Sequence, residues 1–491
     1  MTEQRRHVGQ VDYDQGGEHY LERRQLKSGA AGWVLLAGLG VAYVISGDFA
    51  GWNFGLAEGG WGGLLIATIL MAIMYTCMVL GLAEMSSTLP VAGAGYGFAR
   101  RAMGPLGGFA TGMAVLIEYA VAPAAIATFI GGYVEALGLF GLTNGWLVYL
   151  IAYAIFIGIH LYGVGEALKL MFAITAIAVV ALLATVIGLL PHFSFDNMLD
   201  IKPDASAAMS SDFLPFGIAG VVAALVYGIW FFLAIEGVPL AAEEAHNPTR
   251  DMPRGIIAGM VTLLVFAALI LFIVPGSAGS TTIEGSDNPL PEAIRAVRGD
   301  GSALADFVNY AGLAGLIASF FSIIYAYSRQ LFALSRAGYL PKHLSLTTAR
   351  KTPWAALIAP GTIGFVLAAV LANTMETPAD AGALLINIAV FGATTSYVLL
   401  NLSHILLRRK EPDLERPYRT PGGTFTTGVA LVLSMVAVVA TFFVDEKAAG
   451  ITALVFLAAL AYFWFYSRHH LVAVAPEEEF ALIEQAESEL H

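Results

Sequence analysis

The chain has 491 residues, of which 57% are hydrophobic and only 13% are charged, and its formal net charge is −12. Soluble domains carry roughly 25% charged residues, so this composition excludes an ordinary water-soluble protein and predicts a surface that faces lipid. No basic patch is interleaved with aromatic residues, which excludes nucleic-acid binding, and the single cysteine, Cys77, excludes an intramolecular disulfide.

Twelve apolar segments follow one another along the chain and predict an all-α, polytopic membrane protein. A helix needs ~20 apolar residues to cross a bilayer, and the clearest segments have about that length. Residues 1–28 are polar, so no cleavable signal peptide is predicted before the first span. The predicted spans are 29–56, 61–88, 107–137, 144–162, 166–191, 214–244, 253–275, 304–337, 353–372, 380–408, 423–444 and 449–468.

The lysines and arginines predict the orientation of these spans. Cytoplasmic segments of membrane proteins are enriched in both residue types. With a cytoplasmic N-terminus, all but four of the 25 fall in cytoplasmic segments, so both termini are predicted to be cytoplasmic. The two longest outer segments, near 192–213 and 276–303, are predicted to be exposed loops. The four exceptions are Lys202, Arg295, Arg298 and Lys447.

The predicted organisation is one membrane domain with short tails and no soluble second domain. Residues 1–28 form a cytoplasmic tail, 29–408 a ten-helix transport core, 409–468 the last two spans, and 469–491 an acidic cytoplasmic tail. The last tail is predicted to be solvated because of its acidic residues, which are Glu477, Glu478, Glu479, Glu484, Glu487 and Glu489.

Two of the predicted spans contain residues that interrupt a membrane helix. Ser46, Gly47, Asp48 and Asn53 lie near the middle of span one, and glutamate, glycine and proline fall together at 236–239 in span six. An interrupted helix leaves backbone groups unsatisfied, which is tolerated only where these groups line an enclosed cavity. The breaks are five spans apart, as in an inverted repeat of five spans. Two ordinary kinks are the alternative interpretation.

Three longer motifs identify a family. Residues 82–96 (LAEMSSTLPVAGAGY), 242–253 (AEEAHNPTRDMP) and 328–341 (SRQLFALSRAGYLP) resemble signatures of amino acid–polyamine–organocation transporters. The resemblance covers roughly residues 30–470. It implies a LeuT-like core of five plus five inverted-repeat helices, with helices one and six broken and two helices added. It also implies a transporter of the bacterial inner membrane rather than an enzyme.

The finer resemblance is to bacterial ethanolamine permeases, on residues 45–55 (ISGDFAGWNFG) and 230–240 (WFFLAIEGVPL). In amino acid carriers of this superfamily, bare amides at a Gly-x-Gly break hold the substrate carboxylate. Here Asp48 takes the place of the last glycine. A carboxylate there repels a substrate carboxylate and attracts an ammonium group. The predicted function is therefore uptake of a small protonated amine by alternating access, with ethanolamine as the first candidate substrate. An amino acid, polyamine or choline permease is the alternative.

The predicted substrate site gathers acidic, small polar and aromatic residues around the two breaks. Asp48 is expected to bind the ammonium group, with helix capping as its alternative role. Glu118 is expected in the pocket or as a proton carrier, and Glu236 as a ligand or as scaffold. Aromatic faces bind cations. The full set is Asp48, Ser46, Gly47, Asn53, Glu118, Tyr119, Tyr227, Trp230, Phe231 and Glu236, with Ser319, Ser322 and Asn387 as further polar candidates.

A gate or structural network is expected beyond the membrane, and no cofactor or metal is predicted. The gate residues are the polar residues after span six, which are Glu243, Glu244, Asn247 and Arg250. Arg100 and Arg101 are expected to be their gate partners, with contact to anionic lipid as the alternative. The coupling ion is left open between H⁺ and Na⁺. The resemblance places Ala178 where some proton-coupled relatives carry a lysine, and Ser319 and Ser322 leave a sodium site open.

Two other classes of function have little support. An intramembrane enzyme needs a nucleophile–base pair or metal ligands within the spans, and no HExxH or GxSxG arrangement is present. A channel normally presents a ring or a repeated filter rather than two single breaks. The sequence makes no prediction of affinity, transport direction or oligomeric state.

Overall fold

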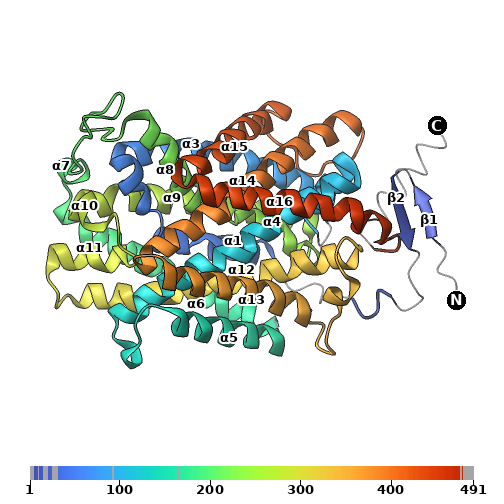
Figure 1. Ribbon diagram of the computed structural model, residues 1–491, viewed down its shortest axis with the longest axis horizontal. Coiled ribbons are helices and arrows are strands. Elements are labelled where there is room, and N and C mark those ends of the chain that lie inside the picture. Colours follow the sequence, from blue (N-terminus) through green and yellow to red (C-terminus); the bar gives the residue numbers. More distant parts are fainter. Residues whose placement is uncertain are drawn as a thin grey trace.

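The computed structural model describes residues 5–8, 10–14, 20–24, 31–90, 93–163, 165–475 and 478. The helices form a bundle whose axes lie roughly along its longest dimension, and both termini lie at one end, the right-hand end in Figure 1. We call this end the termini side and the other end the opposite side. Because both termini share one side, the number of spans is even, as predicted.

Within the described residues, ten helical segments are long and apolar enough to cross a membrane. Two shorter apolar helices, α1 (Trp33–Val44) and α5 (Trp146–Tyr162), complete the twelve predicted spans. The other uninterrupted spans are α3 (Phe54–Thr88), α4 (Gly95–Ala136), α6 (Gly165–Leu189), α9 (Pro248–Ala278), α12 (Ala303–Arg336), α13 (Trp354–Thr374), α14 (Pro378–Lys410), α15 (Thr424–Val444) and α16 (Glu446–Phe465).

Helices α3 and α4 begin several residues before the predicted spans because each bends at a glycine. Gly60 has φ 65° and Gly104 has φ 79°, values that favour glycine because it has no Cβ. The predicted starts, 61 and 107, lie close to these bends. The residues before each bend form an additional helical segment rather than a loop.

The two predicted breaks are present in the structure. Span one consists of α1 and the four-residue helix α2 (Ser46–Phe49), after which the chain turns toward α3. Span six consists of α8 (Gly217–Trp230) and the 3-10 helix η3 (Ile235–Glu244), and Ala234 between them has φ 80°. Pro239 lies inside η3 and cannot donate a backbone hydrogen bond. Because α1 starts at Trp33 and α2 ends at Phe49, span one is shorter than the predicted 29–56.

The prediction of two exposed outer loops is wrong for part of their length. These segments contain α7 (Phe195–Met198), α10 (Ser280–Ile283) and α11 (Pro289–Arg298). Helix α11 starts with a proline and buries Leu290 and Ile294, and its Arg298 donates to the carbonyl oxygen of Gly188 in α6. Short 3-10 helices lie in other connections and are η1 (Leu139–Gly141), η2 (Leu190–His192), η4 (Lys342–Ser345) and η5 (Ser467–His469).

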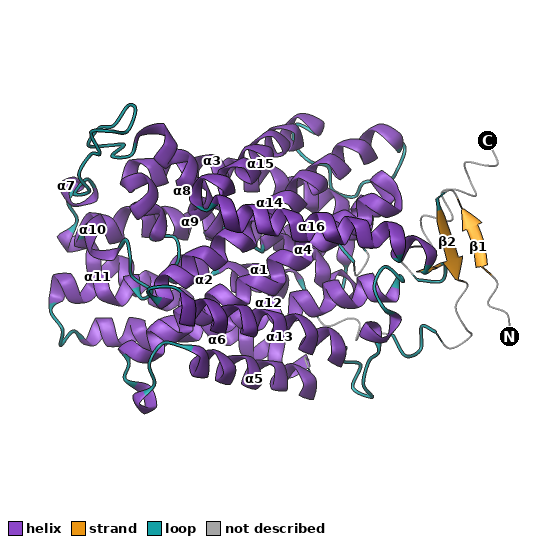
Figure 2. Ribbon diagram, in the orientation of Figure 1, coloured by secondary structure: helices purple, strands orange, loops and turns teal. Residues whose placement is uncertain are grey.

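The tails form a small sheet on the termini side (Figure 2). Strands β1 (Arg5–Val8) and β2 (Val11–Asp14) are antiparallel, and β2 pairs in parallel with β3 (Leu471–Val472), where Tyr13 lies opposite Leu471. The predicted solvated C-terminal tail is wrong for Glu478, which is fully buried. The other acidic residues of this tail lie outside the described residues.

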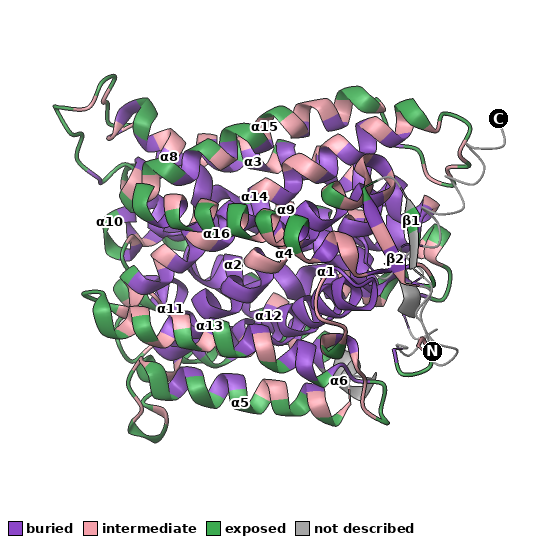
Figure 3. Ribbon diagram, turned by 45° about the vertical axis from the view of Figure 1, so that its right-hand side comes forward, coloured by how far each residue is buried: buried purple, intermediate pink, exposed green. Residues whose placement is uncertain are grey.

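Burial follows the position of each helix in the bundle (Figure 3). Helices α1, α2, α4 and α12 are mainly buried, whereas α5, α15 and α16 expose one apolar face. Ile451, Leu454 and Phe465 of α16 are more than half exposed although apolar, which is expected where a helix faces lipid. The two breaks therefore lie in the interior of the bundle, and of span one only the start of α1, at Trp33 and Val34, is exposed.

Candidate functional site

The two breaks lie in direct contact. A Cβ added at Gly47 would collide with the backbone carbonyl oxygen of Trp230, so only glycine allows the chain segments to approach this closely. The indole Nε1 of Trp230 donates a hydrogen bond to the carbonyl oxygen of Ala50, at 3.0 Å. Gly47, which was predicted in the substrate site, thus allows the contact between the two breaks, and Trp230 satisfies a carbonyl freed by the first break.

Asp48 has no partner at this junction. Its side chain is only 1% exposed, and neither carboxylate oxygen has a hydrogen-bond partner among the described residues. The alternative capping role is wrong, because the backbone amide of Gly51 instead donates to Asn53 Oδ1, at 3.0 Å. A buried charge without a partner costs several kcal/mol, so Asp48 marks a position where a bound cation would be strongly favoured.

Glu236 is fully hydrogen-bonded. Its Oε1 accepts from Tyr119 Oη at 2.8 Å, and its Oε2 accepts from Tyr397 Oη at 3.0 Å. Tyr75 Oη in turn donates to Tyr397 Oη at 2.9 Å. These bonds connect η3 to α3, α4 and α14, which favours the scaffold role of Glu236. The sequence analysis did not identify Tyr75 and Tyr397, although a hydroxyl within an apolar span must find a partner.

Glu118 differs from Glu236 although the two lie close together. It is fully buried on α4, where the side chains of Glu236 and Tyr397 lie close enough to interact with it. Neither of its carboxyl oxygens, however, forms a hydrogen bond of ordinary length and angle with a described residue. Asn387 of α14 is also buried, and neither its Oδ1 nor its Nδ2 has a hydrogen-bond partner among the described residues. These groups resemble Asp48 in having unused hydrogen-bonding capacity.

The candidate serines form hydrogen bonds that join helices. Ser46 Oγ lies 2.8 Å from Ser319 Oγ, and Ser319 Oγ donates to the carbonyl oxygen of Tyr43 at 2.7 Å. Ser322 Oγ donates to the carbonyl oxygen of Ala318 at 2.6 Å and lies 2.7 Å from Met171 Sδ. The hydroxyls therefore tie the first half of span one to α12.

Asn53 closes the opposite side of the site. Its Nδ2 donates to the carbonyl oxygens of Ile283 and Ser286, at 2.6 and 2.8 Å, while its Oδ1 accepts from Gly51. All its polar atoms are thus committed to backbone groups. The structure places Asn53 as a link between the first break and the segment 283–288, rather than as a free substrate ligand.

A second link on the opposite side involves a partly buried acid, Asp287. Asn144 Nδ2 donates to Asp287 Oδ2 at 2.7 Å, and Tyr133 Oη donates to the carbonyl oxygen of Phe49 at the end of α2. Burial raises the pKa of Asp287 above its ordinary range. The segment 283–288 is therefore attached to the rest of the bundle at both Asn53 and Asn144.

The predicted aromatic residues surround the junction. Phe231 stacks on Trp52 with ring centroids 5.6 Å apart, and Trp230 meets Phe129 edge to face at 6.3 Å. Tyr227 packs against Phe54, and the hydroxyl of Tyr119 is committed to Glu236. Trp52 was not among the predicted site residues, and its buried Nε1 has no partner within the described part of the chain.

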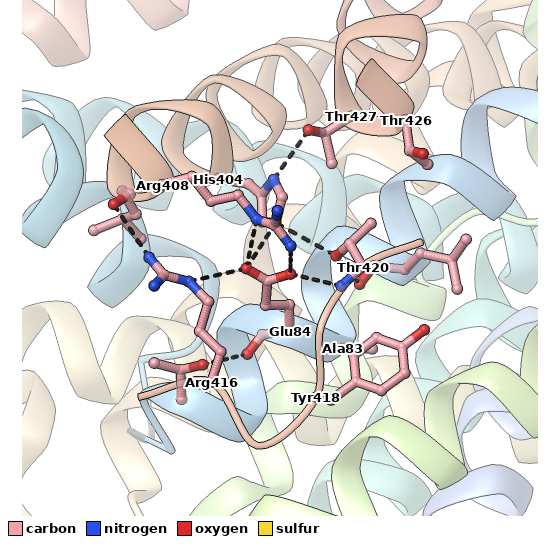
Figure 4. Close-up of polar contacts among 12 residues, drawn as sticks. Ala83, Glu84, His404, Arg408, Arg416, Tyr418, Thr420, Thr426 and Thr427 are labelled. Atoms are coloured by element: carbon pink, nitrogen blue, oxygen red, sulfur yellow. Dashed lines mark hydrogen bonds and ion pairs between the residues drawn. The ribbon is translucent and has the colours of Figure 1, made fainter. Parts of the chain in front are cut away.

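On the termini side, the carboxylate of Glu84 is surrounded by arginine side chains and other hydrogen-bond donors (Figure 4). Arg408 binds both carboxylate oxygens, at 2.8 and 2.5 Å, and Arg416 Nε lies 3.1 Å from Oε1. His404 Nε2 lies 3.3 Å from the carboxylate, and the backbone amide of Thr420 donates to it at 2.7 Å. The network joins α3, α14 and the segment before α15. The sequence analysis quoted Glu84 within a motif but assigned it no role.

Each of the two predicted gate arginines pairs with a glutamate of another segment. Arg100 pairs with Glu478 at 2.6 Å, and Arg101 pairs with Glu411 at 2.7 Å. These glutamates reach the arginines because the tail and the α14–α15 connection lie against the start of α4. The side chains of Glu243 and Glu244 lie outside the described residues, so their pairing with the arginines stays a prediction. Asn247 is the N-cap residue of α9, where its backbone amide donates to Asp251 and its side-chain oxygen accepts from Thr249, and Arg250 is exposed.

Comparison with known proteins identifies the family. The profile of the family described as "Amino acid permease" matches residues 34–475. The chain belongs to the amino acid permease family. This permease is 29% identical over 438 residues to an uncharacterized transporter of Rhizobium meliloti, an alignment that covers 88% of this chain and 90% of the relative.

Relatives whose names state a substrate differ in its chemistry. The branched-chain amino acid permease BcaP of Bacillus subtilis is 27% identical, with 83% of this permease and 86% of the relative covered. The methylthioribose transporter of the same organism is 25% identical, with 77% and 79% covered. The family predicted from the three motifs is confirmed, and it is a family of membrane transporters rather than of enzymes.

Proposed function

We propose that this permease takes up a small protonated amine by alternating access, and that ethanolamine is the first candidate for this substrate. The observation that carries the proposal is Asp48, a buried carboxylate with no partner in the described part of the chain, located at the junction of the two breaks. An ammonium group bound there would supply the opposite charge and the hydrogen bonds that the protein does not provide.

The same position argues against a substrate that carries a carboxylate. A carboxylate placed beside Asp48 would be repelled, and burial makes this repulsion stronger than in water. Glu118 supplies a second carboxyl group without a hydrogen-bond partner in the described chain, and aromatic rings of Trp52, Trp230 and Phe231 lie around the junction. We infer that Asp48 and Glu118 bind the cation, that the rings enclose it, and that Glu236 is scaffold.

The names of the relatives are compatible with this substrate class. One relative is named for branched-chain amino acids, and another for methylthioribose, a sugar derivative without a carboxylate. The family scaffold thus serves substrates that differ in charge. An amino acid, a polyamine and choline are the alternative substrates, and each is an arm of the experiment below.

We further propose that the termini side is cytoplasmic in a bacterial inner membrane, as the distribution of lysine and arginine indicates. A cationic substrate then enters down the membrane potential, which is worth about 2.3 kcal/mol per charge per 100 mV. Ala178 is fully buried, and its Cβ lies at the packed contact between α6, Gly315 and Phe49. The absence of a lysine at this position argues against lysine-based proton coupling.

The test is uptake of labelled ethanolamine into proteoliposomes at a fixed membrane potential. We expect Asp48→Asn to lower uptake at least about a hundredfold, because loss of one member of a buried charge pair costs roughly 3–5 kcal/mol. The matched control is Asp306→Asn, which neutralises an exposed aspartate and should leave uptake unchanged. Unlabelled alanine, putrescine and choline are the competitors. Alanine uptake without ethanolamine uptake would overturn the substrate assignment.

A further inference from the structure

A groove lies on the termini side, outside the substrate site. It has a volume of about 470 Å³ and lies between the start of α1, the first turns of α9 and the α14–α15 connection. The lining consists of Trp33, Pro253, Arg254, Ile257, Ala258 and Tyr418. None of these residues belongs to the substrate site, and Tyr418 borders the Glu84 network (Figure 4).

The walls of the groove continue onto surfaces that face lipid. On α9, Val261 and Val265 follow Arg254 and Ile257 at helical spacing, and both valines are more than half exposed. On α1, Trp33 and Val34 are 44% and 49% exposed. An apolar path therefore runs from the groove along the outer face of α9, and an acyl chain in the membrane can follow it.

The polar end of the groove carries positive charge without a counterion. Arg254 is exposed and makes no hydrogen bond or ion pair with any residue that the structure describes. The same is true of Arg250, one turn earlier on α9, and of Arg419, next to Tyr418. By contrast, Arg100, Arg101, Arg408 and Arg416 on this side all pair with glutamates. The cations at the groove thus lack an anionic partner among the described residues.

We propose that this groove binds an anionic diacyl phospholipid. Its phosphate pairs with Arg254, whose planar guanidinium suits bidentate binding of phosphate. Arg250 and Arg419 add positive charge around the head group, and an acyl chain lies along Ile257 and Ala258. Tryptophan and tyrosine are typical of the depth at which head groups lie, which fits Trp33 and Tyr418. The proposal does not depend on which substrate the permease carries.

The lipid would brace the first half of the broken span. A Cβ added at Gly255 would lie 2.6 Å from Leu36 Cβ and 3.2 Å from the carbonyl oxygen of Trp33, so α1 and α9 touch directly beside the groove. A lipid seated against both helices therefore contacts an element that ends at the substrate site.

The test is native mass spectrometry of the intact, detergent-solubilised permease, titrated with phosphatidylglycerol or phosphatidylcholine. We expect tighter binding of phosphatidylglycerol. Arg254→Gln should weaken it about fivefold, the factor that corresponds to one basic residue near an anionic lipid. Ala258→Trp, which fills the groove but keeps Arg254, should also displace the lipid. The control is Arg23→Gln, an exposed arginine beside Thr347 on another segment of this side.

Three results would overturn the proposal. The first is equal binding of the two lipids, and the second is unchanged phosphatidylglycerol binding in both groove variants. The third is displacement of the lipid by glycerol phosphate at similar concentrations, because a head group alone would then account for the site. A dimer that buries the groove without lipid would likewise replace the lipid by a second copy of the chain.

Discussion

The three buried acids at the junction differ in one respect, which is whether the protein provides partners for them. Glu236 accepts hydrogen bonds from two tyrosine hydroxyls, whereas the oxygens of Asp48 and Glu118 accept none from the described residues. A buried polar group without a partner is costly and is retained where a ligand completes it. Partner count thus separates scaffold from ligand among residues of similar burial.

This difference predicts opposite behaviour for two substitutions. Glu118→Gln should raise the KM for ethanolamine at least about tenfold, since hydrogen bonds to charged groups are worth roughly 1.5–3 kcal/mol, and should leave the Tm nearly unchanged. Glu236→Leu should instead lower stability by about 2–6 kcal/mol, because two buried tyrosine hydroxyls lose the acceptor to which they donate. Uptake kinetics and thermal unfolding in detergent measure both effects. A large Tm loss in Glu118→Gln would make Glu118 scaffold as well.

At the scale of elements, the break in span one also fixes a segment on the opposite side. There Asn53 donates hydrogen bonds to two carbonyl oxygens of the segment 283–288. We expect Asn53→Ala to destabilise that segment by about 1–3 kcal/mol, because three backbone groups lose their partner. Hydrogen exchange of the amides at 283–288 should then speed up by roughly tenfold or more. Unchanged exchange there would show that Asn144 and Asp287 hold the segment alone.

The matched control for this prediction is Asn373→Ala. The side chain of Asn373 is exposed and donates only to the carbonyl oxygen of Ala369 in its own helix. Its removal should leave hydrogen exchange at 283–288 unchanged. A similar increase in both variants would mean that the effect reflects a general loss of stability rather than the loss of a specific link.

The elements themselves could be predicted because their causes are local. Apolar runs located the spans, and glycine, aspartate and proline located the breaks. The partners within the site could not be predicted, because they come from positions far apart in the chain. Tyr75 and Tyr397 are 322 residues apart, and Arg100 and Glu478 are 378 apart. A single sequence contains no signal for such pairs. Helix α11 was missed because ten residues rich in charge and proline resemble a loop.

At the scale of the whole molecule, the N-terminal and C-terminal tails contact each other. Glu478 binds Arg100, Tyr13 and Tyr339, and β2 pairs with β3. Asp12 lies between His7 and His469, at 2.7 and 2.8 Å. The hydrogen bonds from His469 and His7 lower the pKa of Asp12 below its ordinary range.

This contact predicts a pH dependence with a definite sign. A carboxyl group whose pKa is lowered by folding stabilises the folded state above its ordinary pKa of about 3.9, and this contribution disappears as the pH falls through the lowered value. The Tm of the wild type should therefore exceed that of Asp12→Asn near pH 7, and the difference should vanish at strongly acidic pH. A difference that grows as the pH falls would contradict the assigned contact.

Because both termini lie on one side, the structure also predicts which introduced cysteines a membrane-impermeant reagent can reach from outside the cell. In a Cys77→Ala background, Gln10→Cys would place a thiol on the termini side, and Gly301→Cys one between α11 and α12 on the opposite side. A Cβ at Gly301 meets no atom within 4 Å, so this substitution fits without strain. If the termini side is cytoplasmic, a membrane-impermeant maleimide should label Gly301→Cys in intact cells and Gln10→Cys only after permeabilisation. The reverse pattern would invert the orientation, and with it the leaflet in which the lipid groove lies, while leaving the twelve spans and the Asp48 junction unchanged.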